Sequence, residues 1–466
     1  MWFRRDKFPP GPYTGLKGWS LRALTQSPLE MFTELARYGD MVGIRVVNFR
    51  NVFINHPDLI DEVLVGHPRR YFKGRVLRAN RHVFGEGLLT SEGDFWLRQR
   101  RLVQPAFHRA RVAAYAETMV EYAQRLMESW RTGEERDVHQ EMMKLTLQIV
   151  AKTLFNADVA RDTQEVGKSL EQLLELGADF RRTLFVPHWV PTPANLRIKR
   201  EIAFIESILY RIISERRASG RDAGDLLSML LHAQDEDGSR MTDKQLRDET
   251  ITLFLAGHET TAASLSWTWW LLAQNPRVEA KLHAELDDLL AGRAPSMDDL
   301  ARLPYTTNVI TESMRLYPPA WGLARIAVED HELGGYTVRK GMGVAMAQWV
   351  VHRDTRWYDT PEEFRPERWE GDFAKRIPRF AYFPFGGGPR QCIGNSFALM
   401  EATLILATVA QKFRLHLVPD HPVVPLASIT LRPRHGVRVV LEARQPHASD
   451  GLPQVTQPNE QAMSAD

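Results

Sequence analysis

One long helical segment, from Thr242 to Asn275, constrains the fold of this chain more than any other feature. Thr242 and Gln245 have the spacing of a capping box at its start, and Pro276 ends it. About 32 residues at 1.5 Å per residue give a helix of roughly 48 Å, which is enough to cross a whole domain. We therefore expect this helix to be the central element of one large domain.

An apolar stretch within this helix, Ile251 to Ala273, has the length of a transmembrane span. However, His258 and Glu259 lie at its midpoint, and ionisable groups at the centre of a bilayer are costly. Near the start, MWFRRDKFPPGP has positive charge but lacks an apolar stretch of signal-peptide length. We expect a buried central helix with functional polar groups, no transmembrane anchor and a cytoplasmic protein.

The remaining pattern is mostly helical. Helical periodicity extends from Asp94 to Gln234, with breaks at Gln104-Pro105 and at Val186–Pro193. The expected β segments are a hairpin over Met41–Val47 and Asn51–Asn55, a strand within Tyr336–Val350 and a second hairpin over Ser428–Val440. The fold class is therefore mainly α with a minor β portion. We expect a single domain over residues 1–444 and a disordered polar tail over residues 445–466.

The chain has one cysteine, Cys392. It therefore has no intrachain disulfide, and any thiolate chemistry must take place at this residue. Cys392 lies in FPFGGGPRQCIGNSFAL, directly before helical pattern from Asn395 to Phe413. Free amide groups and the dipole at a helix start stabilise a thiolate, which is the form that binds a metal. The alternative is a buried structural cysteine in a glycine turn. The net charge of +2 gives no indication of nucleic-acid binding.

The residues around Cys392 decide between these alternatives. Phe385, Gly388, Arg390, Cys392 and Gly394 match F-x-x-G-x-R-x-C-x-G, and this loop resembles the haem-binding loop of the cytochrome P450 family. The resemblance implies the cytochrome P450 fold, with haem b between the long central helix and the helix after the cysteine. It also implies that Cys392 is the axial thiolate ligand of the iron and that Arg390 binds a haem propionate.

Other motifs of the same family lie before the cysteine loop in the sequence. Glu312 and Arg315 form its E-x-x-R element, and FRPERW resembles its PERF element, with Trp369 where phenylalanine is usual. By resemblance, Arg368 completes a structural triad with Glu312 and Arg315. Taken alone, a Glu–Arg pair at i, i+3 is more often an ordinary solvated helix face.

A W-x-x-x-R element lies upstream, at Trp96 and Arg100. The resemblance implies that both side chains reach a haem propionate, and Arg325 is a further propionate candidate. Without the other motifs, an amphipathic helix with a core tryptophan would be the better interpretation of this element.

The central helix contains AGHETT, residues 256–261, which matches the oxygen-side element A-G-x-[D/E]-T-[T/S]. Ala256 and Gly257 are expected to face the haem, with Gly257 leaving room for O2. Thr260 is expected to hydrogen-bond to the helix backbone and open a local bulge. Glu259 and Thr260 are the expected catalytic pair, able to deliver protons to oxygen.

The acid–alcohol pair favours a monooxygenase, which inserts one atom of O2 into a hydrophobic organic substrate by hydroxylation or epoxidation. A second hypothesis is an enzyme of the same fold that couples phenols or rearranges a peroxide without oxygen insertion. The third is a haem sensor, which would need no such pair.

Electrons must come from outside the chain. Gly85-Glu86-Gly87 and Gly341-Met342-Gly343 lack the third glycine and the βαβ context of a dinucleotide site. We therefore expect NAD(P)H-derived electrons to arrive through a ferredoxin or flavodoxin with its reductase, and we expect a monomer. A local basic excess suited to an acidic partner is formed by Arg98, Arg101, Arg109 and Arg111.

The residues expected to line the substrate pocket share an apolar or aromatic character, which predicts a hydrophobic substrate. These residues are Leu88, Leu89, Phe185, Phe254, Ala256, Ala320, Trp321, Leu323 and Ile429. AGHETT and FRPERW resemble the bacterial fatty-acid-hydroxylating branch, here without its fused reductase. Fatty acids, terpenoids, steroids and polyketides all stay open as substrates.

Overall fold

The computed structural model describes residues 7–12, 27–46, 49–156, 163–178, 186–220, 224–235 and 238–444. The expected disordered tail, residues 445–466, and the expected pocket residue Phe185 lie outside these ranges.

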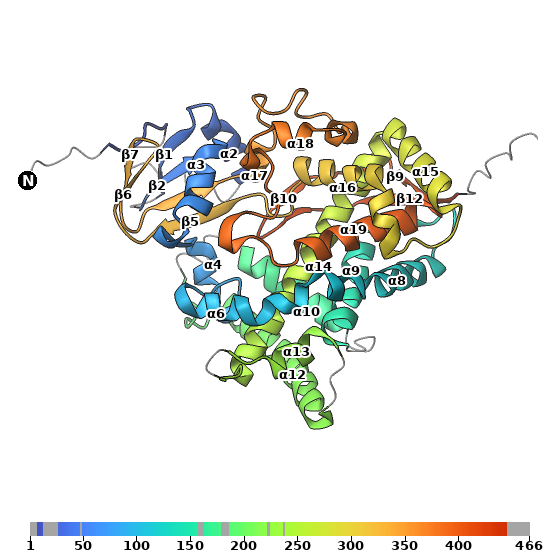
Figure 1. Cartoon of the computed structure of the whole chain (residues 1–466), viewed down its shortest axis with the longest axis horizontal. Helices are drawn as coiled ribbons and strands as arrows, with labels where there is room; N and C mark the ends of the chain where they lie inside the picture. The colour runs from blue at the N-terminus through green and yellow to red at the C-terminus, as the bar shows by residue number, and fades with distance from the viewer. Residues whose placement is uncertain are drawn as a thin grey trace, which may run out of the picture.

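The predicted central helix is α14, Asp243–Gln274, which runs through the middle of the molecule (Figure 1). The Thr242 hydroxyl accepts a hydrogen bond from the Gln245 N–H at 3.2 Å, and the Gln245 side chain accepts one from the Thr242 N–H at 2.8 Å. Asn275 caps the other end, before α15 (Pro276–Leu290). The predicted bounds and the capping box are confirmed.

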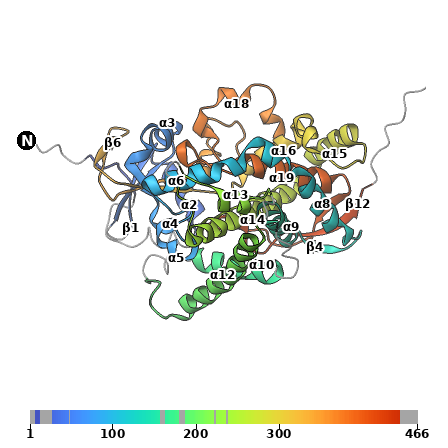
Figure 2. The ribbon, with the colours of Figure 1, turned by 60° about the horizontal axis from the view of Figure 1, so that its bottom comes forward.

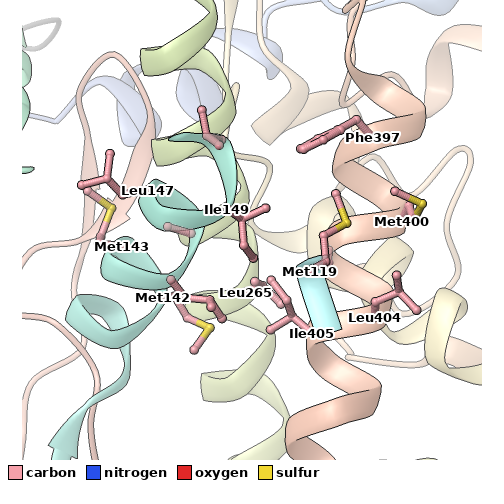
Figure 3. Close-up of a cluster of buried hydrophobic side chains, with 14 of the residues drawn as sticks. Met119, Met142, Met143, Leu147, Ile149, Leu265, Phe397, Met400, Leu404 and Ile405 are labelled. Atoms are coloured by element: carbon pink, nitrogen blue, oxygen red, sulfur yellow. The ribbon is translucent and has the colours of Figure 1, made fainter. Parts of the chain in front are cut away.

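The main hydrophobic core lies where α14 packs against α9 (Val138–Phe155), α16 (Pro304–Leu316) and α19 (Asn395–Ala410). A further helix, α8 (Ala116–Glu128), packs on α9 and α19. Figure 3 shows Met119 of α8, Met142 of α9, Leu265 of α14 and Leu404 of α19 gathered between the helices, all fully buried. Because α19 is apolar nearly all round, it is covered on all sides, and this fixes the position of the cysteine loop before it.

In the described part of residues 94–234, the predicted helical region is confirmed apart from one short strand, β4 (Glu135–Asp137). The break at Gln104 is a 3-10 turn, Gln104–Phe107, and Pro193 is the first residue of α12. This region also contains α6 (Gly93–Val103), α7 (Arg109–Ala113), α10 (Thr163–Ala178), α12 (Pro193–Ser219) and α13 (Leu226–His232). Figure 2 brings α10 and α12, which pack together, to the front.

The predicted first hairpin is confirmed and forms one edge of a five-stranded sheet at one end of the molecule (Figure 1). The sheet order is β1 (Met41–Val46), β2 (Phe49–Ile54), β8 (Gly343–Met346), β5 (Leu323–Ala327) and β3 (Tyr71–Lys73). The strand predicted within Tyr336–Val350 divides into β7 (Tyr336–Val338), β8 and the short helix α17 (Gln348–Val351).

The predicted second hairpin, Ser428–Val440, is wrong, because its two halves belong to different sheets. β11 (Leu431–Pro433) pairs with β10 (Pro425–Ala427), whereas β12 (Arg438–Ala443) pairs with β4 and with β9 (Phe413–Leu417). Pro433 lacks a backbone donor and Gly436 has a positive φ of 72°, so the chain turns between the two strands instead of continuing a ladder.

Among the residues that the structure describes, no helix is both long enough and apolar enough to cross a membrane.

The predicted triad of Glu312, Arg315 and Arg368 is confirmed as a buried ionic network. The Arg315 guanidinium donates to both oxygens of Glu312 at 2.9 Å, and Arg368 Nε donates to Glu312 Oε1 at 3.3 Å. All three side chains have no exposed surface. Arg315 also donates to three backbone carbonyls, those of His352, Pro361 and Glu363. The triad therefore joins α16 to the loops that precede the cysteine segment.

Trp369, the departure from the usual PERF pattern, has a role of its own. Its indole Nε1 donates to Glu312 Oε2 at 2.8 Å. A phenylalanine could not make this bond, so the tryptophan adds a donor to a buried carboxylate that already binds two arginines.

This network predicts two graded losses of stability. Glu312→Gln leaves the buried Arg315 guanidinium without its counter-charge and leaves Arg368 paired with Asp359, and we expect it to lower the free energy of unfolding by about 3–5 kcal/mol. Trp369→Phe removes one hydrogen bond to a charged group, and we expect a loss of about 2 kcal/mol. Urea unfolding measures both. The control is Trp189→Phe, at a side chain that is 70% exposed. Equal effects at positions 369 and 189 would contradict the role of Trp369.

Candidate active site

The cysteine loop is closed by backbone bonds and by a glycine that no other residue could replace. The Cys392 N–H donates to the Phe385 carbonyl at 3.0 Å, which brings the two ends of the loop together. Gly388 has a φ of +67°, and a Cβ at this position would lie 1.9 Å from the Leu64 carbonyl oxygen. The loop therefore packs tightly against the helical turn Glu62–Gly66. It places Cys392 just before α19, as predicted.

The Cys392 thiol is surrounded by protein and still carries exposed surface. Burial raises its pKa, whereas the Gly394 N–H and the Arg100 guanidinium lower it. Its side chain nonetheless has solvent-accessible surface. The thiol is therefore accessible, and two groups beside it favour the thiolate against the effect of burial.

The oxygen-side element also carries exposed surface in the middle of a buried helix. Ala256 is exposed and Thr260 is half-buried, whereas Leu255 and Glu259 are buried. The Thr260 hydroxyl donates to the Ala256 carbonyl at 2.6 Å, so the predicted hydrogen bond is confirmed. The predicted local bulge is absent, because α14 is α-helical throughout residues 243–274.

Glu259 and Thr260 are consecutive on α14, so their side chains leave the helix in different directions, and their role as a catalytic pair stays a prediction. One interpretation of this element changes. A Cβ at Gly257 would lie 2.9 Å from Val150 Cγ2 of α9. The glycine therefore permits close packing of α9 on α14, and its missing side chain does not point toward the exposed face at Ala256.

The W-x-x-x-R element lies against the cysteine loop. On α6, Arg100 Nη1 donates to the Gln391 carbonyl at 2.9 Å, and the Arg390 guanidinium carbon lies 4.1 Å from the centre of the Trp96 ring. Arg390 also donates to the Ser91 carbonyl at 2.8 Å and forms an ion pair with Glu92. Residues separated by almost 300 positions are thus held in one cluster.

Further cations complete this cluster. Burial and repulsion from Arg390 lower the pKa of Arg325 to about 10 and bring that of Lys73 well below its ordinary value. Arg390, Arg325 and Lys73 outnumber the two carboxylates that act on them, Glu92 and Glu249. This donor set fits a haem group, because a thiolate is available for the iron and cations are available for two propionates.

Four charged residues of the site were not predicted from the sequence: Lys73, Glu92, Glu249 and Glu401. Glu401 could have been noticed, because it is the only charged residue within the apolar sequence from Ser396 to Ala410. It is fully buried in α19 beside Thr261, and burial raises its pKa to about 8 against the opposing effect of the Thr261 hydroxyl. Lys73, Glu92 and Glu249 belong to no motif, and their roles depend on tertiary contacts.

The expected pocket residues separate into groups. Leu89, Ala320, Leu323 and Ile429 are half-buried, whereas Leu88 and Phe254 are buried and belong to the main core cluster.

Trp321 is also buried, in a different core cluster. It packs with Phe32 and Phe53, and its indole N–H donates to the Ser428 carbonyl at 2.9 Å. Its place at the pocket stays a prediction, as does that of Leu88 and Phe254.

One arginine of the expected basic docking region, Arg98, is bound within the chain. Arg98 Nε donates to Asp235 Oδ2 at 2.8 Å and Arg98 Nη2 to Ser239 Oγ at 2.8 Å, so this arginine ties α6 to the segment after α13. Arg101 and Arg111 are exposed.

A family model described as Cytochrome P450 matches residues 7–437. Among curated relatives, cyclooctat-9-en-7-ol 5-monooxygenase of Streptomyces melanosporofaciens is 39% identical, over 85% of this chain and 87% of the relative. Pentalenene oxygenase of Streptomyces avermitilis is 36% identical, over 91% of this chain and 94% of the relative.

A solved structure gives the same result for the fold. The crystal structure of the cytochrome P450DA heme domain superimposes with a TM-score of 0.86 at 30% sequence identity. The match covers 95% of this chain and 99% of that structure.

The buried carboxyl of Glu401 predicts a pH dependence of stability. Its pKa is about 8 in the folded protein and near 4.5 in an unfolded chain, so the folded state binds the proton more tightly. The contribution of Glu401 to stability is therefore greatest below pH 4.5 and is lost as the pH rises to 8, by at most about 1.4 kcal/mol per pH unit. Glu401→Gln should flatten this decline in unfolding measurements between pH 5.5 and 8.5. The exposed Glu128→Gln should not, and parallel curves for wild type and Glu401→Gln would refute the burial effect.

Proposed function

Because the chain belongs to the cytochrome P450 family, we propose that it inserts one oxygen atom into a cyclic terpenoid hydrocarbon or its alcohol. We propose that the electrons come from NAD(P)H through a ferredoxin or flavodoxin with its reductase. The family and its relatives establish the coarser activity, which is monooxygenation of a hydrophobic substrate.

The observation that carries the substrate class is the character of the candidate pocket. Its half-buried and exposed residues, Leu89, Ala256, Ala320, Leu323 and Ile429, are all apolar. Such a surface favours an uncharged molecule over one with a carboxylate, which would have to lose its hydration without gaining a partner. The relatives support the same class, since their names specify pentalenene, a hydrocarbon, and cyclooctat-9-en-7-ol, an alcohol.

Haem b with a thiolate ligand supplies the oxygen-activating chemistry when it is bound. Cys392 would hold the iron, and the Gly394 N–H and Arg100 would favour its thiolate form against the larger opposing effect of burial. Trp96, Arg390 and Arg325 would hold the propionates. These groups come from α6, β5 and the cysteine loop, so the cofactor would join parts of the chain that are far apart in sequence.

On the opposite side, Thr260 would hold the proton that the reaction consumes. Its hydroxyl donates to the Ala256 carbonyl at 2.6 Å, which leaves the oxygen lone pairs able to accept a hydrogen bond. Glu259 is buried next to it in sequence and would exchange protons with Thr260 through an intervening group.

The electron-transfer partner would bind on the side of the molecule that carries α6 and α7. Arg101 and Arg111 are exposed there and suit an acidic partner. Arg98 is held by Asp235, so it would contribute less than its neighbours.

Ligation through Cys392 has a spectroscopic test. The reduced protein should give the strongly red-shifted Soret band of a thiolate-ligated haem on binding carbon monoxide, because the sulfur donates electron density to the iron. Cys392→Ser should lose this band. A band at the same position in the variant would exclude Cys392 as the ligand.

Oxygen insertion and the role of Thr260 are tested with pentalenene, NAD(P)H and a ferredoxin–reductase pair. The product should carry one atom from ¹⁸O2, and Thr260→Ala should lower the product formed per NAD(P)H by about tenfold or more. Thr268→Ala, two turns away on the same helix, is the control and should keep the wild-type ratio. A product without ¹⁸O would favour a non-inserting oxidation instead.

A further inference from the structure

Charged side chains hold the loop between α5 (Arg81–Phe84) and α6, here called loop 85–92, along most of its length. Asp248 Oδ2 accepts a hydrogen bond from the Glu86 N–H at 2.9 Å. Arg81 donates to the Thr90 carbonyl at 3.0 and 3.2 Å, and Arg390 donates to the Ser91 carbonyl. Most of this loop is buried, so its backbone polar atoms need partners from the protein, and charged side chains supply several of them.

The Leu88–Leu89 segment is held from both sides by buried side chains. Glu249 Oε2 of α14 accepts the Leu88 N–H at 3.0 Å. The buried Lys73 Nζ donates to the Leu88 carbonyl at 2.5 Å and to the Leu89 carbonyl at 2.6 Å. The backbone donor of Leu88 and the carbonyls of both leucines therefore each have a side-chain partner.

The second oxygen of Glu249 connects the segment to the haem side of the site. Glu249 Oε1 accepts a hydrogen bond from Gln99 Nε2 at 3.0 Å, and Gln99 directly precedes Arg100 on α6. Burial raises the pKa of Glu249 to about 7, while its bonds from Leu88 and Gln99 lower it. One carboxylate thus joins α14, α6 and loop 85–92.

The glycines of Gly85-Glu86-Gly87 explain how the loop comes so close to α14. Gly85 has a φ of +66°, and a Cβ there would lie 2.0 Å from the Asp248 carboxylate. A Cβ at Gly87 would lie 2.3 Å from Thr252 Oγ1. The pair of glycines therefore permits contact with the oxygen-side helix.

We propose that Glu249, Gln99 and Lys73, here called the Glu249 clamp, are positioning residues that fix Leu88 and Leu89 as a rigid wall of the substrate pocket. The wall then sets which substrates fit and which of their carbon atoms face the oxidant. This inference rests on the proposed placement of Leu88 and Leu89 at the pocket. None of the three clamp residues needs to contact the substrate.

The clamp is tested first by amide hydrogen exchange of the haem-loaded protein, followed by mass spectrometry of peptides that cover residues 84–90. Glu249→Leu removes both acceptor oxygens, and exchange in these peptides should become roughly tenfold faster. Glu249→Gln keeps an oxygen for the Leu88 N–H and should stay within about twofold of wild type. The control, Glu279→Leu, removes a buried carboxylate of α15 that pairs with Arg414 and should leave these peptides unchanged.

Selectivity is tested in the same variants with two iron ligands, imidazole and the larger 4-phenylimidazole, whose dissociation constants are read from the Soret band. Release of the wall in Glu249→Leu should favour the larger ligand over imidazole by about fivefold or more. Leu89→Ala should shift the ratio in the same direction, and Glu249→Gln and Glu279→Leu should keep it.

The outcomes separate the inference from the proposed pocket. Unchanged exchange in Glu249→Leu would overturn the clamp. Faster exchange with an unchanged ligand ratio, while Leu89→Ala shifts that ratio, would overturn its role in selectivity. An unchanged ratio in Leu89→Ala as well would instead overturn the placement of the loop at the pocket.

Discussion

The rest of the structure depends on holding one sulfur atom in its anionic form inside the protein. Burial opposes the thiolate of Cys392, and only the Gly394 N–H and the Arg100 guanidinium act in its favour. This balance requires a fixed loop. The bond from Cys392 to the Phe385 carbonyl and the close contact of Gly388 with Leu64 fix it on one side, and the apolar helix α19 fixes it on the other.

Buried charges recur at three places around this centre, with different consequences. The triad of Glu312, Arg315 and Arg368 is complete within the chain and stabilises the fold behind the cysteine loop. The cluster of Arg390, Arg325 and Lys73 has excess positive charge, which suits an anionic cofactor. The side chains of the Glu249 clamp bind backbone atoms of loop 85–92. A buried ion pair is a weak source of stability in general. The positive cluster is therefore better explained by the cofactor that it would bind, and the clamp by the loop that it positions.

Much of the site could be predicted because its residues lie in short motifs with fixed spacing. The haem loop, the E-x-x-R pair and the capping box of α14 each depend on neighbours within a few residues. The errors occurred where tertiary contacts decide. Arg98, expected in a docking surface, instead binds Asp235, which lies far away in sequence. The second hairpin failed because Pro433 and Gly436 send adjacent strands into different sheets. Glu249 and Lys73 act through loop carbonyls and amides, which no sequence pattern marks.

The central claim is that iron is bound through sulfur from residue 392. Iron K-edge X-ray absorption of the ferric protein tests it most directly, because sulfur and nitrogen scatterers on the axis have different distances and phases. The account predicts one sulfur scatterer in the first coordination shell of the wild type and its loss in Cys392→Ser. A first shell of nitrogen and oxygen alone in the wild type would contradict it.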